Sequence, residues 1–170
     1  MRCLIPALAV AVLAVCAGQA KADMVDHEPA LLTLGVGGYN VLHQDKDAIF
    51  RGEYRFGTSF LYIRPIAGVE VTSAGGVYAY GGFGVNIPIT DHIVLFPSGA
   101  FGYWSRGNGS KDLGSHDEFR TGAEIAWRFD DDSRIGVTFH HISNDGITQR
   151  NPGVEEALLE YSIPLGSIFP

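Results

Sequence analysis

Cysteine is nearly absent from this sequence, and its two copies lie where they cannot serve the folded protein. Cys3 and Cys16 both fall within residues 1–22, a segment that we expect to be removed on export. A chain that enters an oxidising compartment without cysteine forms no disulfide. Zinc–cysteine sites and cysteine nucleophiles are excluded for the same reason.

Long apolar runs are also scarce. One run, Leu4 to Ala17, follows the positive Arg2 and precedes Ala20-Lys21-Ala22, a small-x-small cleavage site. It is shorter than the roughly 20 residues that a membrane helix needs, which favours a signal peptide at residues 1–22 over a spanning helix. A signal peptide is also favoured over a lipid-modified Cys16. Residues 23–170 contain no run of spanning length, so they would enter a membrane only as a closed β-barrel.

Basic residues are few. The chain has 12 Lys and Arg, including Arg2 and Lys21 of the leader, against 19 Asp and Glu. This acidic balance would repel a phosphate backbone, so nucleic acid is excluded as a partner. No linker, repeat or low-complexity tract divides residues 23–170, which predicts a single domain.

Glycine and alternating side chains are what the sequence does contain. Its 22 glycines and many aromatic residues favour strands over helices. Between Asp117 and Phe129, one parity carries Phe119, Ile125 and Trp127, whereas the other carries Glu118, Arg120 and Glu124. Similar patterns of varying strength predict eight strands, at residues 31–41, 48–56, 61–71, 77–87, 92–104, 117–129, 133–143 and 155–163.

Eight antiparallel strands of about ten residues suit the smallest transmembrane barrels, which turn apolar side chains to lipid and polar ones to the lumen. A soluble eight-stranded ligand carrier has the same periodicity with the faces reversed. Tyr39, Tyr54, Trp104 and Trp127 near predicted strand ends favour the membrane form, because aromatic girdles mark its interfaces. The predicted fold class is therefore an all-β, eight-stranded antiparallel transmembrane β-barrel in the outer membrane of a Gram-negative bacterium.

The connections fit this topology. With both termini in the periplasm, those near 56–60, 88–91 and 130–133 are predicted to be periplasmic turns. The connections around 43–46, 73–76, 105–115 and 144–154 then face the cell exterior. Two of these are long, as extracellular loops of such barrels commonly are.

Chemically capable side chains gather where the last two strands approach the exterior. His141 and Ser143 continue the apolar, lipid-facing parity of the seventh strand, and Glu155 begins the eighth. Antiparallel pairing can place His141 opposite Glu155, with Cβ atoms about 5 Å apart. His141 could then accept the Ser143 proton while Glu155 orients the imidazole. The alternative is that the strands have left the bilayer and the three are ordinary rim residues.

The segment His141-Ile142-Ser143-Asn144-Asp145-Gly146-Ile147, followed by Asn151-Pro152-Gly153-Val154-Glu155, resembles the lipid A 3-O-deacylase family, the PagL-type outer-membrane acyl hydrolases. The resemblance rests on H-x-S-N-x-G followed by Asn and Glu at the family's spacing. It implies that Ser143 is the nucleophile, His141 the general base and Glu155 the residue that orients it.

The same resemblance implies lipid A of lipopolysaccharide as substrate and hydrolysis of an ester-linked acyl chain at the 3-O position, without a metal or organic cofactor. It also implies that Asn144, Gly146 or Asn151 helps to bind the oxyanion, although Asn and Gly favour turns in any protein. The adjacent His140 and His141 point to opposite faces of a strand and form no joint metal site.

Other features leave alternatives open. Glu156 neighbours Glu155, but its parity places it inside the barrel. The chain ends in Phe169-Pro170, whereas such barrels commonly end in an aromatic residue. A homodimer is compatible with the sequence, which does not identify the released acyl chain. A noncatalytic outer-membrane barrel with a structural or surface-interaction role is the alternative function.

Overall fold

The computed structural model describes residues 25–26, 28–57, 59–60 and 62–167, so the predicted leader and the chain end at Phe169-Pro170 lie outside the described residues. Eight long strands make up most of the fold: β2 (Leu31–Tyr39), β3 (Asp47–Arg55), β5 (Ile63–Thr72), β6 (Val77–Val85), β8 (Ile93–Ser105), β9 (Asp117–Arg128), β10 (Arg134–Ser143) and β11 (Val154–Pro164). Three two-residue strands, β1 (Val25–Asp26), β4 (Ser59–Phe60) and β7 (Ile87–Pro88), and the 3-10 turn η2 (Leu165–Ser167) lie beside them.

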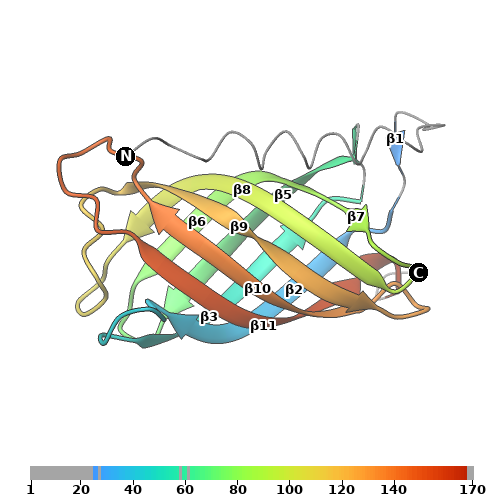
Figure 1. Ribbon diagram of the computed structural model, residues 1–170, viewed down its shortest axis with the longest axis horizontal. Coiled ribbons are helices and arrows are strands. Elements are labelled where there is room, and N and C mark those ends of the chain that lie inside the picture. Colours follow the sequence, from blue (N-terminus) through green and yellow to red (C-terminus); the bar gives the residue numbers. More distant parts are fainter. Residues whose placement is uncertain (1–24, 27, 58, 61, 168–170) are drawn as a thin grey trace, which may run out of the picture.

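The long strands form a closed antiparallel β-barrel. Their order is β5-β3-β2-β11-β10-β9-β8-β6, and a β5–β6 pairing completes the ring. All eight predicted strands are therefore confirmed, with ends that differ by a few residues. The strands are strongly tilted (Figure 1), as closure of a small barrel requires. In the described part of the chain, no helix has the length and apolar character needed to span a membrane.

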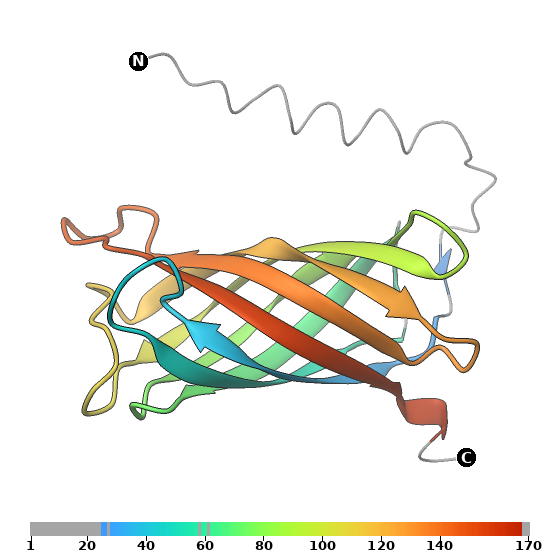
Figure 2. The ribbon, with the colours of Figure 1, turned by 60° about the horizontal axis from the view of Figure 1, so that its bottom comes forward.

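The connections divide between the two ends of the barrel. Loops 40–46, 73–76, 106–116 and 144–153 gather at one end, and the turns 89–92 and 129–133 lie at the other (Figure 2). This is the division that the sequence predicts for the exterior and periplasmic ends. The loop that joins β10 to β11 therefore shares the exterior end with three other loops.

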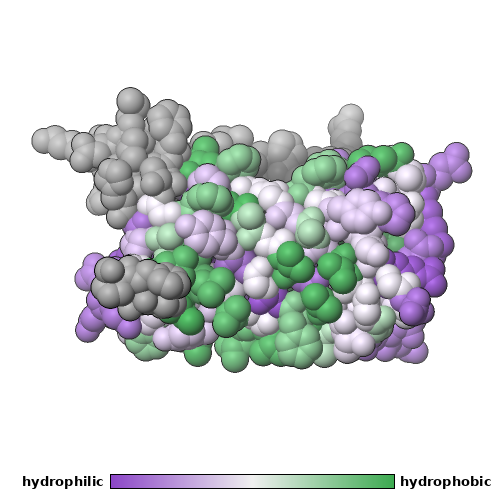
Figure 3. All heavy atoms as spheres, turned by 180° about the vertical axis from the view of Figure 1, so that it is seen from behind, coloured by the Kyte–Doolittle hydropathy of each residue, from purple (hydrophilic) through white to green (hydrophobic). Residues whose placement is uncertain are grey.

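The two faces of each strand differ as the alternation predicts. Along β10, exposed Ile135, Val137 and Phe139 alternate with buried Arg134, Thr138 and His140. On the face seen in Figure 3, apolar side chains gather over the middle of the outer wall, and hydrophilic ones gather toward its ends. An exposed apolar surface of this extent is expected to face lipid. The soluble carrier, which would turn its apolar face inward, is thereby excluded.

The lumen is filled by paired charges. Three buried arginines reach five buried glutamates: Arg51 donates to Glu70, Glu156 and Glu160, Arg55 to Glu53, Glu124 and Glu160, and Arg120 to Glu53 and Glu70, at 2.5–3.3 Å. Buried charges need such partners, because an unpaired charge away from water is costly. The interior is therefore a packed polar core.

Aromatic and apolar side chains close the exterior end of the lumen. Tyr39 and Trp104 are buried and stack on each other, with ring centroids 5.5 Å apart. The prediction that they belong to a lipid-facing girdle is wrong, because both have inward parity, whereas Tyr54 and Trp127 are exposed on the outer wall. Leu113 of the β8–β9 loop is also buried in this apolar cluster. The loop is thus anchored in the mouth of the barrel.

Candidate active site

His141 and Glu155 meet on the outer wall. They are directly opposed in the β10–β11 ladder, as predicted, and His141 Nδ1 lies 3.2 Å from Glu155 Oε1. The His141 side chain is 46% exposed and that of Glu155 is 18% exposed. Since Nδ1 is engaged by the carboxylate, Nε2 is the ring nitrogen left to exchange a proton with another group.

Ser143 lies two residues further along the same face of β10. It is the last residue of the strand, half-buried, and opposite Phe119 of β9. Within the described residues its hydroxyl forms no hydrogen bond, so side-chain rotation is needed to bring Oγ to His141 Nε2. Catalytic hydrogen bonds are often long before substrate binds and shorten in the complex. The structure therefore brings the three predicted residues to one side of the wall, with the His–Glu contact already formed.

The predicted oxyanion residues are placed differently from one another. The buried Asn144 amide donates to Leu113 O at 3.1 Å and Arg150 O at 2.9 Å, and its Oδ1 accepts from Gly146 N. Asn151 Oδ1 accepts from Asn144 N at 3.1 Å, and the Asn151 Nδ2 group has no hydrogen-bond partner among the described residues. The Asn144 side chain thus organises the loop, whereas Asn151 retains donors for a ligand.

Three residues that were not predicted to belong to the site surround the pair: Gly153 lies beside His141, His43 lies beside Glu155, and Lys111 contacts Gly153. Gly153 adopts φ +60°, and a Cβ built there would lie 2.7 Å from His141 Cε1. Lys111 Nζ donates to Gly153 O at 2.9 Å, and His43 Nδ1 lies 3.7 Å from Glu155 Oε2. Lys111 and His43 come from other exterior loops, so no local pattern could reveal them. Only Gly153 could have been suspected from the sequence, because a glycine in a turn before a strand can adopt the left-handed conformation.

An apolar surface adjoins Ser143. Phe119 packs against Phe101 with ring centroids 5.0 Å apart, and Tyr103 stacks on His116 at 4.9 Å. Phe101, Tyr103 and Phe119 are exposed on the outer wall. A hydrophobic chain lying along this wall would pass beside the Ser143 hydroxyl.

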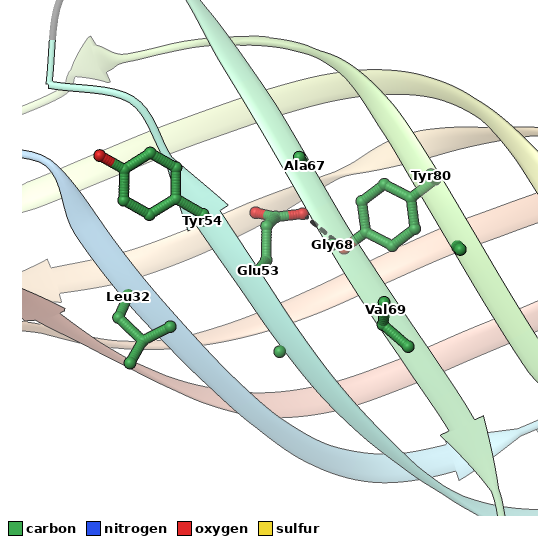
Figure 4. Close-up of a pocket in the computed structure, with 9 residues that line it drawn as sticks. Leu32, Glu53, Tyr54, Ala67, Gly68, Val69 and Tyr80 are labelled. Carbon is green, nitrogen blue, oxygen red and sulfur yellow. Dashed lines mark hydrogen bonds between the residues drawn. The ribbon is translucent and has the colours of Figure 1, made fainter.

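A depression lies elsewhere on the barrel, where β2, β3, β5 and β6 line it. It has a volume of about 480 Å³ and forms where Gly52, Ala67 and Ala79 leave the wall of β3, β5 and β6 thin. Figure 4 shows Tyr80 reaching past Gly68 to hydrogen-bond Glu53 there, at 2.8 Å. Its buried Glu53 carboxylate and Tyr80 hydroxyl are thus already paired. No cluster of three metal-ligating side chains occurs in residues 28–57 and 62–167.

Comparison with known proteins gives a family. The model of the family described as "Lipid A 3-O-deacylase (PagL)" matches residues 36–164. The crystal structure of the outer membrane enzyme PagL matches with a TM-score of 0.61 and 23% identity, over 79% of this chain and 99% of that chain.

Two other solved barrels share the fold. A de novo designed transmembrane β-barrel matches with a TM-score of 0.56 and 12% identity over 79% of this chain and 92% of that chain. The Yersinia pestis outer membrane protein Ail matches with a TM-score of 0.51 and 12% identity over 79% of this chain and 98% of that chain. No curated protein matches. Because the family model spans more than half of the sequence, this outer-membrane β-barrel belongs to the lipid A 3-O-deacylase (PagL) family.

Proposed function

We propose that this protein hydrolyses the ester-linked acyl chain at the 3-O position of lipid A, with Ser143 as nucleophile, His141 as general base and Glu155 as the residue that orients the imidazole. The observation that carries the proposal is the 3.2 Å contact between His141 and Glu155 on the lipid-facing wall, with Ser143 on the same face. Family membership supports the proposed substrate class and the choice of bond.

The reaction would run as an acyl transfer. Ser143 Oγ attacks the ester carbonyl while His141 Nε2 takes the hydroxyl proton, and Glu155 stabilises the imidazolium through Nδ1. His141 then returns the proton to the departing sugar oxygen, which leaves an acyl-enzyme. Water, deprotonated by His141, cleaves that ester and releases the fatty acid with a free Ser143 hydroxyl. Proton and electron pairs balance without any cofactor.

Charge on the tetrahedral oxygen needs donors beside Ser143. Asn151 Nδ2 supports this role best, because the Asn144 and Gly146 backbone N–H groups already donate to Asn151 Oδ1 and Asn144 Oδ1. Asn144 would then act by shaping the loop, and Gly146 by adopting the left-handed conformation at φ +81° that the turn needs. Gly146 N–H could reach the oxyanion if Asn144 Oδ1 released it.

The position of the triad supports lateral entry of substrate. All three groups lie on the outer wall near the exterior end, so a lipid of the outer leaflet reaches them without entering the lumen. The aromatic surface beside Ser143 would hold the acyl chain, where apolar burial stabilises it. Delivery to that membrane requires export, which we assign to a signal peptide at residues 1–22, followed by a single barrel domain from residue 23.

Mass spectrometry of purified lipid A incubated with wild type and with Ser143→Ala tests the proposal. Wild type should release one acyl chain from the 3-O position, and the variant should release none while still inserting as a heat-modifiable barrel. Release by Ser143→Ala at the wild-type rate would refute the assigned nucleophile. Loss of an acyl chain from another position would refute the 3-O assignment alone. Chemical cross-linking in liposomes would show whether the active form is a homodimer.

A noncatalytic outer-membrane barrel is the second candidate. The half-buried Ser143 hydroxyl, which has no hydrogen bond among the described residues, favours the enzyme over it, because a rim residue with a purely structural role would be expected to bond to its loop. Absence of any lipid A product from the folded wild type would favour this second candidate.

A further inference from the structure

The orientation of His141 is set on two sides. Glu155 contacts Nδ1, and Gly153 lies beside the adjoining Cε1–Nε2 edge of the ring. A Cβ on Gly153 would come within 2.7 Å of His141 Cε1 and 3.2 Å of Nε2, so a side chain at residue 153 would collide with the edge that carries the reactive nitrogen. A ring that is 46% exposed on an outer wall has few other neighbours, so Gly153 limits its rotation.

Gly153 is itself held by a lysine from another loop. Residue 153 precedes the first residue of β11, so its carbonyl receives no bond from the barrel ladder. Lys111 Nζ supplies one at 2.9 Å and also donates to Asn40 Oδ1 at 3.1 Å. Hydrogen bonds from an ammonium are about twice as strong as neutral ones. One side chain thus joins the β2–β3, β8–β9 and β10–β11 loops.

The loop that carries Lys111 is firmly seated. Its neighbours Ser110 and Leu113 are buried in the mouth of the barrel, where Ser110 Oγ accepts from Gly76 N at 3.2 Å and contacts Thr72 Oγ1. Leu113 O accepts from the Asn144 amide, and Gly114 O accepts from Thr148. Lys111 is therefore fixed at its base, unlike an ordinary surface lysine.

Asn40, the second hydrogen-bond acceptor of Lys111, is also held in place. Asn40 is buried at the end of β2, and its Nδ2 donates to Asp45 O at 2.7 Å. The next residue, Val41, donates its N–H to Glu155 O at 3.0 Å. The ammonium therefore lies between a turn that holds the backbone of Glu155 and a glycine that holds the ring of His141.

We propose that Lys111 is a positioning residue for the acyl-transfer reaction: by fixing Gly153 beside the imidazole, it keeps His141 in the rotamer that contacts Glu155. The inference rests on the proposed function for its effect on rate, whereas the effect on the histidine side chain is independent of activity. Lys111 itself contacts no reacting atom.

Lys111→Met and Lys111→Arg, compared with Lys46→Met, test this inference. Lys46 is an exposed lysine of the β2–β3 loop whose ammonium forms no hydrogen bond within the described residues. In detergent micelles with purified lipid A, Lys111→Met should lower kcat by about 10- to 100-fold at unchanged KM, because small displacements of catalytic groups have effects of this size. Lys111→Arg should restore most of the rate, and Lys46→Met should match wild type.

The NMR signal of ¹³Cε1-labelled His141 gives a second readout. Its chemical shift should move in Lys111→Met and in Gly153→Ala, which pushes on the ring directly, but not in Lys46→Met. Unchanged kcat and His141 signal in folded Lys111→Met would overturn the inference. A change in KM alone would also overturn it, since Lys111 would then contact substrate.

A loss of folding can be distinguished from a loss of activity in these variants. Heat-modifiable migration verifies each barrel, and if Lys111→Met does not fold, Lys111→Gln replaces it with the same expectations. An inactive wild type would refute the proposed function, yet the His141 signal would still decide whether Lys111 orients the ring.

Discussion

Two successive residue pairs on β10 and β11 face opposite sides of the barrel wall and differ in how many hydrogen-bond partners they have. His140 and Glu156 are paired across the ladder and face the lumen, and His141 and Glu155 are paired next to them and face outward. The inner pair is tied to its surroundings: Arg51 donates to Glu156 at 2.9 Å, and His140 contacts Ser98 at 3.2 Å.

The outer pair has far fewer partners. His141 is bonded to Glu155 alone, and the neighbouring Ser143 hydroxyl to nothing within the described residues. Polar groups that face lipid are destabilising, by roughly 2–4 kcal/mol for a charge at the midplane and less near the interface. The inner groups stabilise the barrel, whereas the barrel has no structural need of the outer ones. The difference supports the proposal that the outer wall carries the active site.

Exchanging one histidine at a time is the sharpest way to break this comparison. We expect His141→Asn to lower the rate of acyl release by at least about 10³-fold, because the proposed general base is lost. His140→Asn should retain most activity and instead lower the urea midpoint of unfolding. Initial rates on lipid A and unfolding curves, measured on the same two variants, give the result. Equal rate losses in both would show that the two walls are not functionally distinct.

Removing an inner arginine should act on stability alone. Arg51→Met leaves Glu70, Glu156 and Glu160 without a shared buried guanidinium, which is expected to lower the free energy of unfolding by about 3–5 kcal/mol. The fraction that still folds should keep nearly wild-type kcat, because Arg51 is separated from His141 by the barrel wall. Arg106→Met, at the exposed rim, is the matched control and should leave stability unchanged. A kcat loss in folded Arg51→Met would mean that the lumen supports the triad.

The sequence predicts much of this arrangement because the barrel repeats one simple rule. Alternation in β9 and β10 assigns each side chain to a wall, and the short spacing between Ser143 and Glu155 requires a hairpin that brings them together. The prediction from aromatic character fails at Tyr39 and Trp104, which were assigned to a lipid-facing girdle although their parity in the strands points inward. At a barrel mouth, large rings are also needed to close the lumen, and composition does not distinguish the two uses.

Contacts between loops are the other part that the sequence could not give. Lys111 and Gly153 are 42 residues apart, and Lys111 and Asn40 are 71 apart, with no periodic pattern relating them. Only closure of the barrel brings those loops to one end. The strands could be predicted from local chemistry, whereas the surroundings of His141 depend on the register of the whole ring.

The loops at the exterior end place ion pairs in a third environment, bulk water, where we expect substitutions to have the smallest effect on activity. Asp112 Oδ2 accepts from Arg150 at 2.8 Å and Oδ1 accepts from Gly114 N at 2.9 Å. The Gly114 N–H, followed by Arg150 and Arg106, lowers the pKa of Asp112 below its usual value. A carboxylate whose pKa is lowered in the folded protein stabilises the fold at pH values above its usual pKa, which is near 3.8 for Asp. That stabilisation is lost as the pH falls through the lowered pKa.

Asp112→Asn should therefore lower kcat by less than about fivefold at neutral pH, since exposed ion pairs are weak and screened by salt. The loss should shrink further at high ionic strength, because the wild-type pair is then weakened too. Rates measured at low and high salt with Lys46→Met as the reference check this expectation. A loss as large as that of His141→Asn would place Asp112 among the groups that the reaction needs, and the division between a structural lumen, a catalytic wall and a tolerant rim would fail at the rim.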